Sequence, residues 1–161
     1  MILHMSQKKI SALVGSIPSG LFIVTIRHGQ DRGAFLASWI QQTSFQPPMV
    51  TMAMAKDRPI GNWFVQNRLF GIHILSDHHK KLLKHFANPP MDPIQIFDGL
   101  STHPSMRGVP VLTESIGMLE CSVMHRISTG DHELVVGEVV DAHEFENTKP
   151  RVHIRKNGFQ Y

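Results

Sequence analysis

The chain has 161 residues, 42% of them apolar, and a formal net charge of +3, which suits one globular domain with a sizeable core. No apolar run approaches the length of a membrane-spanning helix, and the first residues lack the apolar segment of a secretory signal. The only cysteine, Cys121, excludes an internal disulfide framework and suits a reducing compartment. We therefore expect a soluble, cytoplasmic protein with one domain, residues 1–161, and no membrane partner.

The predicted elements of the first half are mostly strands. A short amphipathic helix is predicted at 6–20, and β-branched and aromatic residues predict strands further on. These strands are expected at 21–29, 34–40 and 49–56, with a turn at 29–33. A short helix with Pro59 at its first position is predicted at 59–67.

The second half continues this pattern. We predict a strand at 69–76, a helix at 77–87, two long strands at 117–128 and 132–144 joined as a hairpin, and a final strand at 151–161. Residues 88–110 are proline-rich and predict a long binding loop or lid.

About seven strands with few helices favour a closed antiparallel barrel over a doubly wound nucleotide-binding fold. The chain has neither GxGxxG nor GxxxxGK[ST], so no glycine-rich loop holds a nucleotide phosphate. The eleven histidines show no HExxH spacing, and we predict no metal site. The basic residues are scattered and lack the stripe of a nucleic-acid binder, so we expect no nucleic-acid partner.

The stretch "ASWIQQTSFQPP" at 37–48 suggests a ligand cradle. Ala37 and Ser38 are small enough to let a flat ring approach the backbone, and hydroxyl and amide side chains follow that can pair with a polar ring edge. Pro47 and Pro48 keep the preceding residues extended.

One strand later, "AKDRP" at 55–59 suggests a phosphate site. Lys56 and Arg58 lie just before the predicted Pro59 helix, whose free N–H groups and dipole would add to the two positive charges. Asp57 would repel a phosphate unless it points away or caps the helix, and the alternative for this segment is a solvated turn. Taken together, the two segments favour a ligand with a flat polar ring and a phosphate.

Five segments in order and spacing resemble the flavin reductase-like family with the FMN-binding split barrel. They are "ASWIQQTSFQPP", "AKDRP", "LFGIHILSDHHKKLLKHFA", "GVPVLTESIGMLECSV" and "GDHELVVGEVV", and the resemblance extends from about Pro18 to Val140. The first two look especially like the flavin reductase module of flavodiiron oxygen reductases from photosynthetic microbes.

The resemblance implies a mainly β fold, a six-stranded antiparallel Greek-key split barrel with short flanking helices. It also implies a homodimer with FMN near the subunit interface. By the matching positions, Ala37, Ser38, Trp39 and Ile40 would line the isoalloxazine ring, Ser44 would lie near the ribityl phosphate, Lys56 and Arg58 would hold the phosphate, and Phe86 and Ala87 would close over the cofactor.

The resemblance also implies an activity, that of an NAD(P)H:flavin oxidoreductase that transfers hydride to flavin N5 and passes electrons onward, with an electron-acceptor protein as a possible partner. His132, in "GDH", would lie near the flavin and the nicotinamide as the catalytic-site residue. The closing "NGFQY" at 157–161 resembles the family's C-terminal glycine–aromatic segment.

Plainer roles remain open for three of these residues: a core aromatic for Trp39, helix packing for Phe86 and a solvated hairpin residue for His132. Two other functions also remain open. One is a flavin-bearing electron carrier without NAD(P)H reductase activity, and the other is a split-barrel binding module that carries haem or no cofactor.

Overall fold

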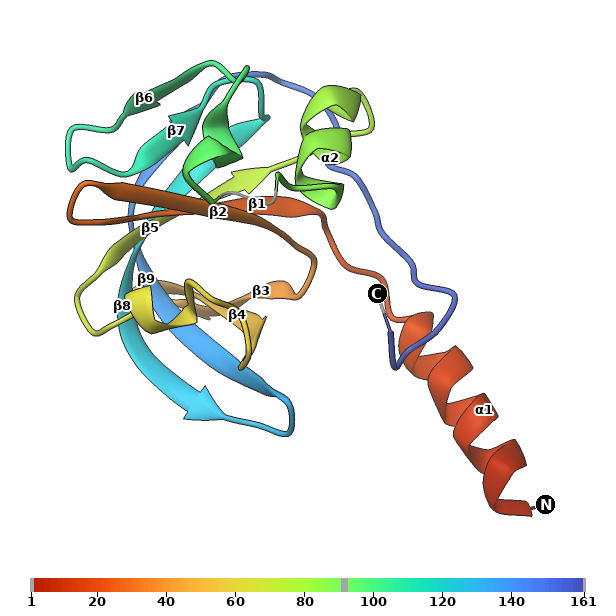
Figure 1. Ribbon diagram of the computed structural model, residues 1–161. Coiled ribbons are helices and arrows are strands. Elements are labelled where there is room, and N and C mark those ends of the chain that lie inside the picture. Colours follow the sequence, from red (N-terminus) through yellow and green to blue (C-terminus); the bar gives the residue numbers. More distant parts are fainter. Residues whose placement is uncertain (1, 91–92, 161) are drawn as a thin grey trace.

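The computed structural model describes residues 2–90 and 93–160 and consists mainly of antiparallel strands (Figure 1). Seven strands form one strongly curved sheet in the order β2-β1-β5-β8-β9-β4-β3. Their bounds are β1 Phe22–His28, β2 Asp31–Ala37, β3 Ile40–Phe45, β4 Pro48–Ala55, β5 Leu69–Ile74, β8 Gly117–Ser128 and β9 His132–Glu144. A separate two-stranded sheet joins β6 Thr102–Pro104 to β7 Pro110–Leu112.

The sheet curls into a split barrel. β2 and β3 are its two edge strands, and they are linked through Ser38 and Trp39 without pairing with each other in the described chain. The expected closed barrel is therefore open along this seam. The predicted count of six strands is also wrong, because the sheet has seven.

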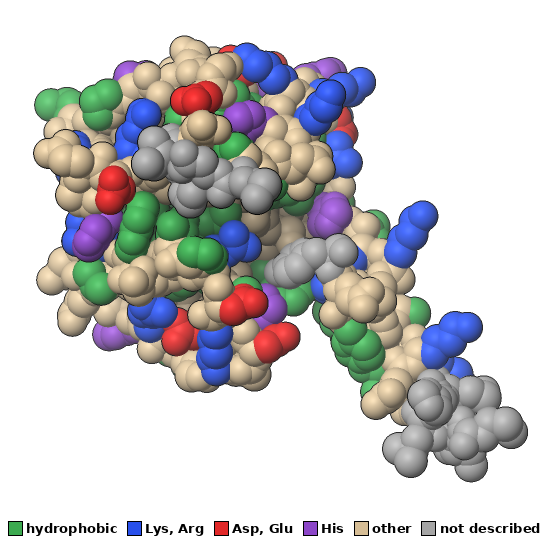
Figure 2. Space-filling model, in the orientation of Figure 1, with side chains coloured by type: hydrophobic (Ala, Val, Ile, Leu, Met, Phe, Trp, Pro, Cys, Tyr) green, Lys and Arg blue, Asp and Glu red, His purple; other side chains and the backbone are tan. Residues whose placement is uncertain are grey.

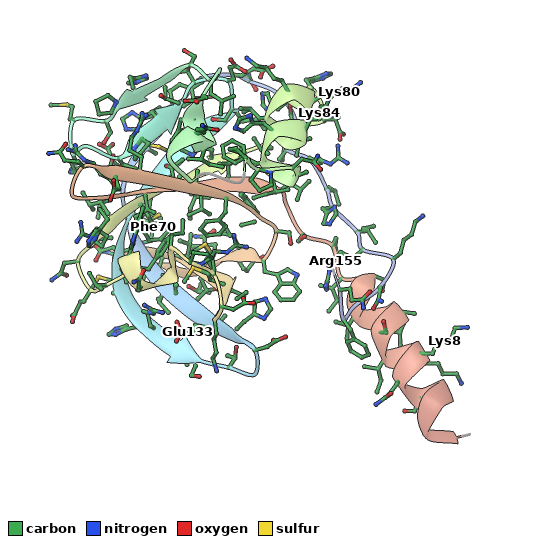
Figure 3. The ribbon with its side chains drawn as sticks, viewed as in Figure 1. Lys8, Phe70, Lys80, Lys84, Glu133 and Arg155 are labelled. Carbon is green, nitrogen blue, oxygen red and sulfur yellow. The ribbon has the colours of Figure 1, made fainter. Side chains whose placement is uncertain are left out.

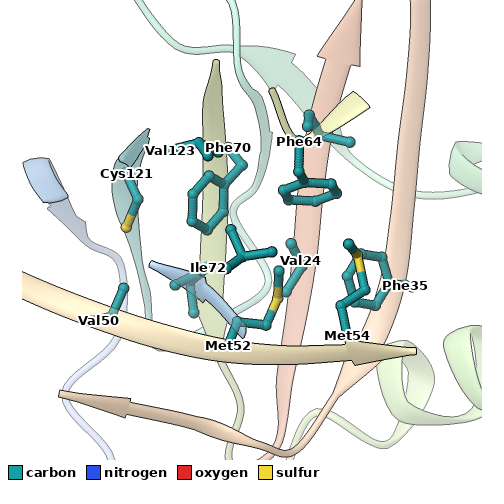
Figure 4. Close-up of a cluster of buried hydrophobic side chains, with 12 residues drawn as sticks. Val24, Phe35, Val50, Met52, Met54, Phe64, Phe70, Ile72, Cys121 and Val123 are labelled. Carbon is teal, nitrogen blue, oxygen red and sulfur yellow. The ribbon is translucent and has the colours of Figure 1, made fainter. Parts of the chain in front are cut away.

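The interior of the barrel is a cluster of apolar side chains in which Phe70, Phe64 and Phe35 pack edge to face (Figure 4). Phe64 and Phe70 are fully buried, and the alternate residues Val50, Met52 and Met54 of β4 fill the space beside them. Alternation of buried and half-buried residues along β4 is the pattern expected of a strand with one face in a core.

A second apolar cluster lies outside the barrel beneath α2 (Lys80–Ala87). Leu82 and Phe86 of this helix pack with Leu21, Leu75 and Leu112, and so attach the helix to the outer face of the sheet. The 3₁₀ helix η2 (Pro93–Phe97) contributes Ile96 and Phe97 to the same cluster. The predicted long loop at 88–110 thus contains η2 and β6.

The first helix, α1 (Ile2–Gly15), projects from the barrel, and the C-terminal segment 151–160 meets the end of α1 nearest the barrel (Figure 1). Backbone N–H groups of Arg155 and Gly158 donate to the carbonyls of Gly15 and Ser11 at 3.0 and 2.9 Å. None of the helices in the described part of the chain is long and apolar enough to cross a bilayer.

Two predicted elements differ from the structure, and one strand was not predicted. The helix expected at 59–67 is only a 3₁₀ turn, η1 (Gly61–Trp63), which ends at the C-cap Phe64, and Asn67 further on has φ +64°. The strand expected at 151–161 is a single bridge between Ser19 and His153 in the described residues. β3 was not predicted as a strand, because its exposed glutamines give no apolar alternation.

Candidate functional site

A pocket of about 570 Å³ lies where the ends of β2 and β4 meet the end of α2. We call it the alanine pocket because its wall contains Ala34, Ala37, Ala53, Ala55 and Ala87. Methyl side chains leave room beside the backbone, and this volume is within the range of small-molecule and cofactor pockets. Of the residues predicted as cofactor-binding or catalytic, six line it: Ala37, Ser38, Arg58, Phe86, Ala87 and His132.

Ser38 is the polar residue most deeply placed in this wall. It is 5% exposed, and its Oγ is buried without a hydrogen-bond partner among the described residues. Buried hydroxyl groups are nearly always hydrogen-bonded, so this atom fits a site whose ligand supplies the partner. The local backbone is held in place because the carbonyl of Trp39, the next residue, accepts a hydrogen bond from the Ala53 N–H at 2.9 Å.

Arg58 brings positive charge to the same pocket. Its guanidinium carbon lies 4.1 Å from the centroid of the Phe35 ring, a cation–π contact that orients the side chain along the pocket wall. The N–H of Arg58 donates to the Ala55 carbonyl at 3.2 Å, which forms the tight turn after β4.

A second pocket of about 690 Å³ adjoins the first and shares Ala55 and His132 with it. We call it the tryptophan pocket. The Trp39 ring lies 5.0 Å from the His132 imidazole, measured between centroids, and the Arg155 guanidinium carbon lies 4.6 Å from the Trp39 centroid. Figure 3 shows Arg155 between the barrel and α1.

His132 is positioned by the sheet and by its neighbour in sequence. It is the first residue of β9 and pairs with Ala55, the last residue of β4. Its Nδ1 lies 2.7 Å from Oδ1 of Asp131. This hydrogen bond holds the pKa of the Asp131 carboxyl below its ordinary value, so the carboxylate is ionised and fixes one ring nitrogen of His132.

Lys56 and Arg58 do not lie together. Lys56 lines the tryptophan pocket, where its Nζ donates to the Gly130 carbonyl at 2.8 Å, whereas Arg58 lines the alanine pocket. Because η1 has only three residues, no helix dipole strengthens an anion site beside Pro59, contrary to the sequence-based expectation.

Ile40 and Ser44 line neither pocket. The Ile40 side chain packs against the barrel core. Ser44 lies near the far end of β3, paired with Met49 and next to a bulge in that strand.

Sequence reasoning did not identify His153 and Arg155 of the C-terminal segment as pocket residues, although the family resemblance pointed to the closing residues 157–161. His153 lines the alanine pocket, and Arg155 and Phe159 line the tryptophan pocket, while Tyr161 lies outside the described residues. Burial lowers the pKa of His153 from its ordinary value, with Arg151 and Arg155 adding repulsion. The basic alternation in "RVHIRK" was the available signal, but it was interpreted as a strand.

The fold is that of proteins that reduce flavins. The structure superposes on the NADH:FAD oxidoreductase of Streptomyces globisporus with a TM-score of 0.78 at 23% identity, covering 89% of this chain and 80% of that one. A flavin reductase domain protein from Arthrobacter gives a TM-score of 0.79 at 24% identity, covering 88% and 87%. At these identities the comparison establishes the shared fold.

Sequence comparison then establishes the family. Residues 14–160 match the flavin reductase like domain, and the chain belongs to that family. The predicted family is thereby confirmed.

The curated relatives are longer proteins. Diflavin flavoprotein A 1 of Synechocystis is 36% identical over 150 residues, which cover 92% of this chain and 26% of that protein. A putative diflavin flavoprotein A 6 of Nostoc is 36% identical over 154 residues, covering 94% and 27%. This chain therefore spans about a quarter of the length of the relatives it matches.

Proposed function

We propose that the chain acts as a single flavin reductase-like domain that binds FMN in the alanine pocket and works as an NAD(P)H:flavin oxidoreductase. Bound FMN supplies the redox chemistry: a hydride from NAD(P)H is taken up at flavin N5, and the electrons pass onward. The observation that carries the proposal is the alanine pocket itself, whose wall holds a cationic Arg58 and a buried Ser38 Oγ that has no hydrogen-bond partner in the described part of the chain.

The pocket fits a flat, partly polar ring. Its alanines leave space for a ring close to the ends of β2 and β4, and Phe86 and Leu21 supply larger apolar surfaces. Ser38 Oγ can donate to, or accept from, one polar atom of the ring edge. A ligand that pairs with this hydroxyl removes the cost of burying it alone.

Arg58 is the better candidate of the two cations for the phosphate. It lines the alanine pocket, and its planar guanidinium can donate two parallel hydrogen bonds to phosphate oxygens. Lys56 lies in the neighbouring tryptophan pocket, which shares Ala55 with the alanine pocket. Its positive charge can therefore attract the phosphate at longer range.

The tryptophan pocket is the proposed position of the nicotinamide substrate. It shares His132 with the alanine pocket, so a molecule in one pocket is adjacent to a molecule in the other. The Asp131 carboxylate fixes the Nδ1 side of His132, and the imidazole packs against the Trp39 ring. In this arrangement His132 orients the nicotinamide.

We further propose that the protein forms a homodimer through α1. Ile10, Leu13 and Val14 are spaced along one stripe of this helix, with Leu13 70% exposed, and Ile17 continues the stripe beyond its end. Figure 2 shows hydrophobic side chains along one side of the projecting helix. A second copy would cover this stripe.

The decisive experiment is an anaerobic titration of the purified protein with NADH and then NADPH, following the flavin absorption band. A reductase is yellow, carries FMN, and bleaches with at least one nicotinamide. A colourless protein that fails to bind added FMN would refute the proposal. Bound flavin that neither nicotinamide reduces would instead indicate an electron carrier.

A further inference from the structure

A third pocket, of about 540 Å³, lies at the opposite end of the barrel from the alanine pocket. We call it the arginine pocket because Arg27, Arg68 and Arg107 line it. Arg27 is near the end of β1, whereas Leu21 of the alanine pocket immediately precedes that strand. The six residues of extended chain from Leu21 to Arg27 span roughly 20 Å, and Figure 1 shows the β1–β2 turn on the side away from the C-terminus.

Two of these arginines, Arg27 and Arg68, carry charge that no acidic side chain of the described residues balances. Arg27 Nε donates to the Gly29 carbonyl at 2.8 Å, and Arg68 Nη1 donates to the Arg27 carbonyl at 3.3 Å. Neither guanidinium forms an ion pair with a carboxylate anywhere in residues 2–90 or 93–160. Each has further N–H donors beyond the one held by the backbone.

Arg107 differs from the other two because it faces acids. Its Nη1 lies 3.0 Å from Oδ2 of Asp141 and 3.6 Å from Oε1 of Glu120, which is buried. Three guanidinium groups therefore line the pocket, and the two nearby carboxylates both pair with Arg107.

The backbone around the pocket holds these side chains in place. Gly29, Asn67 and Gly108 all have φ in the left-handed region, at +60°, +64° and +87°. A Cβ atom on Gly108 would lie 3.3 Å from Nη1 of Arg27, so the absence of a side chain there lets the guanidinium lie close over the loop. Holding the two unbalanced guanidinium groups in advance reduces the entropy lost when they bind an anion.

We propose that the arginine pocket binds a small phosphate-bearing anion, separate from the flavin site. Guanidinium groups match phosphate geometry through paired N–H···O bonds, and a concave site of this volume suits a small molecule. An acidic electron-transfer protein is a weaker match, because the arginine pocket shares no lining residue with the alanine or the tryptophan pocket, so a partner docked here would not reach the proposed flavin site directly. This proposal stands independently of the flavin chemistry.

The test is calorimetric titration of the FMN-loaded protein with sodium pyrophosphate at constant ionic strength. We expect saturable binding that Arg27→Ala/Arg68→Ala weakens by about tenfold or more. Arg27→Lys/Arg68→Lys keeps the two charges but loses the paired N–H donors of the guanidinium groups, so its affinity for pyrophosphate should lie between those of the wild type and the alanine variant. The matched control, Lys8→Ala/Lys149→Ala, removes the same charge from exposed positions that line none of the three pockets and should bind like the wild type.

Three results would overturn the proposal. The first is the absence of pyrophosphate binding by the wild type. The second is equal weakening of pyrophosphate binding by Arg27→Ala/Arg68→Ala and by the control Lys8→Ala/Lys149→Ala. The third is displacement of pyrophosphate by polyglutamate at lower carboxylate concentration than by free phosphate, which would identify an acidic protein surface as the ligand.

Discussion

The Trp39 indole and the His132 imidazole lie against each other, with ring centroids 5.0 Å apart and planes inclined by 46°. Trp39 is in the two-residue link between β2 and β3, and His132 begins β9. They meet because β4 pairs with both β3 and β9, which places Ala53 beneath the Trp39 carbonyl and Ala55 opposite His132. This contact forms the boundary between the alanine and tryptophan pockets.

Arg58→Ala is expected to weaken FMN binding by about tenfold or more while changing riboflavin binding much less, because riboflavin lacks the phosphate. Flavin fluorescence quenching measures both affinities. Lys56→Ala, in the neighbouring pocket, should have the smaller effect on FMN. Equal losses of FMN and riboflavin affinity in Arg58→Ala would contradict the assignment of Arg58 to the phosphate.

Ser38→Ala is expected to have opposite effects on the flavin-free and flavin-bound protein. Without flavin, removing a buried hydroxyl that has no partner in the described chain should leave the free energy of unfolding unchanged or raise it by about 1 kcal/mol. Flavin affinity should fall. Urea denaturation and flavin titration measure the two quantities.

Ser115→Ala is the matched control for this change. Ser115 is also buried, but its Oγ donates to the Leu112 carbonyl at 2.9 Å, so its removal should lower the free energy of unfolding by about 1 kcal/mol. If Ser38→Ala destabilised the flavin-free protein as much as Ser115→Ala does, the Ser38 hydroxyl would have an internal partner.

His73 is expected to make stability depend on pH between about 4 and 6.5. The Leu112 N–H donates to its Nε2 at 3.0 Å, so the proton is on Nδ1, which donates to the Ile23 carbonyl at 3.1 Å. Burial lowers the pKa of His73 from 6.5 to about 4. Between these values the unfolded chain binds more protons, so the free energy of unfolding falls as the pH falls, by about 3 kcal/mol in total.

The comparison that isolates this effect is wild type against His73→Gln in urea denaturation at several pH values. The variant should be less stable near pH 7, and the difference should shrink as the pH approaches about 4. A difference that stays constant over this range would show that His73 does not titrate in this way.

Gly137→Ala is expected to destabilise the barrel by about 1–3 kcal/mol, because the new Cβ would lie 2.8 Å from Cζ of Phe70. Gly130→Ala is the control, since nothing lies within 4 Å of a Cβ at that position. Combining Gly137→Ala with Phe70→Leu should cost less than the sum of the two single changes, and thermal denaturation of all variants tests this. If the losses of stability in the two single variants simply added, the destabilisation by Gly137→Ala would not arise from a clash with Phe70.

Leu13→Glu is expected to convert a homodimer into a monomer, because it puts a charge in the middle of the apolar stripe on α1. Sedimentation velocity measures the change. Lys8→Glu introduces the same side chain on the other side of the helix, where Figure 3 shows Lys8 exposed, and should leave the dimer intact. A wild-type protein that sediments as a monomer would refute the dimer proposal.

Some elements were readable from the residue pattern alone. The ranges predicted for the last two long strands coincide with β8 and β9, since long runs with frequent β-branched residues and a turn between them allow few alternatives. β3 was not readable, because an edge strand paired on one side and exposed along Gln41 and Gln42 needs no apolar alternation.

For the candidate site too, the sequence identified some residues, whereas other relationships appear only in the structure. The sequence singles out Ala37, Ser38 and Arg58 as site residues, because they lie at or just after strand ends in small-residue or cationic segments. The curvature of the sheet, not chain order, brings Arg58 into the same pocket as Ala37 and Ser38. Chain order does not show that Lys56 and Arg58 enter different pockets, or that Arg155 reaches Trp39 from the other end of the chain. Those relationships depend on long-range strand pairing and on the docking of 151–160 against α1, where the contacting residues are too far apart in sequence for any local pattern to record them.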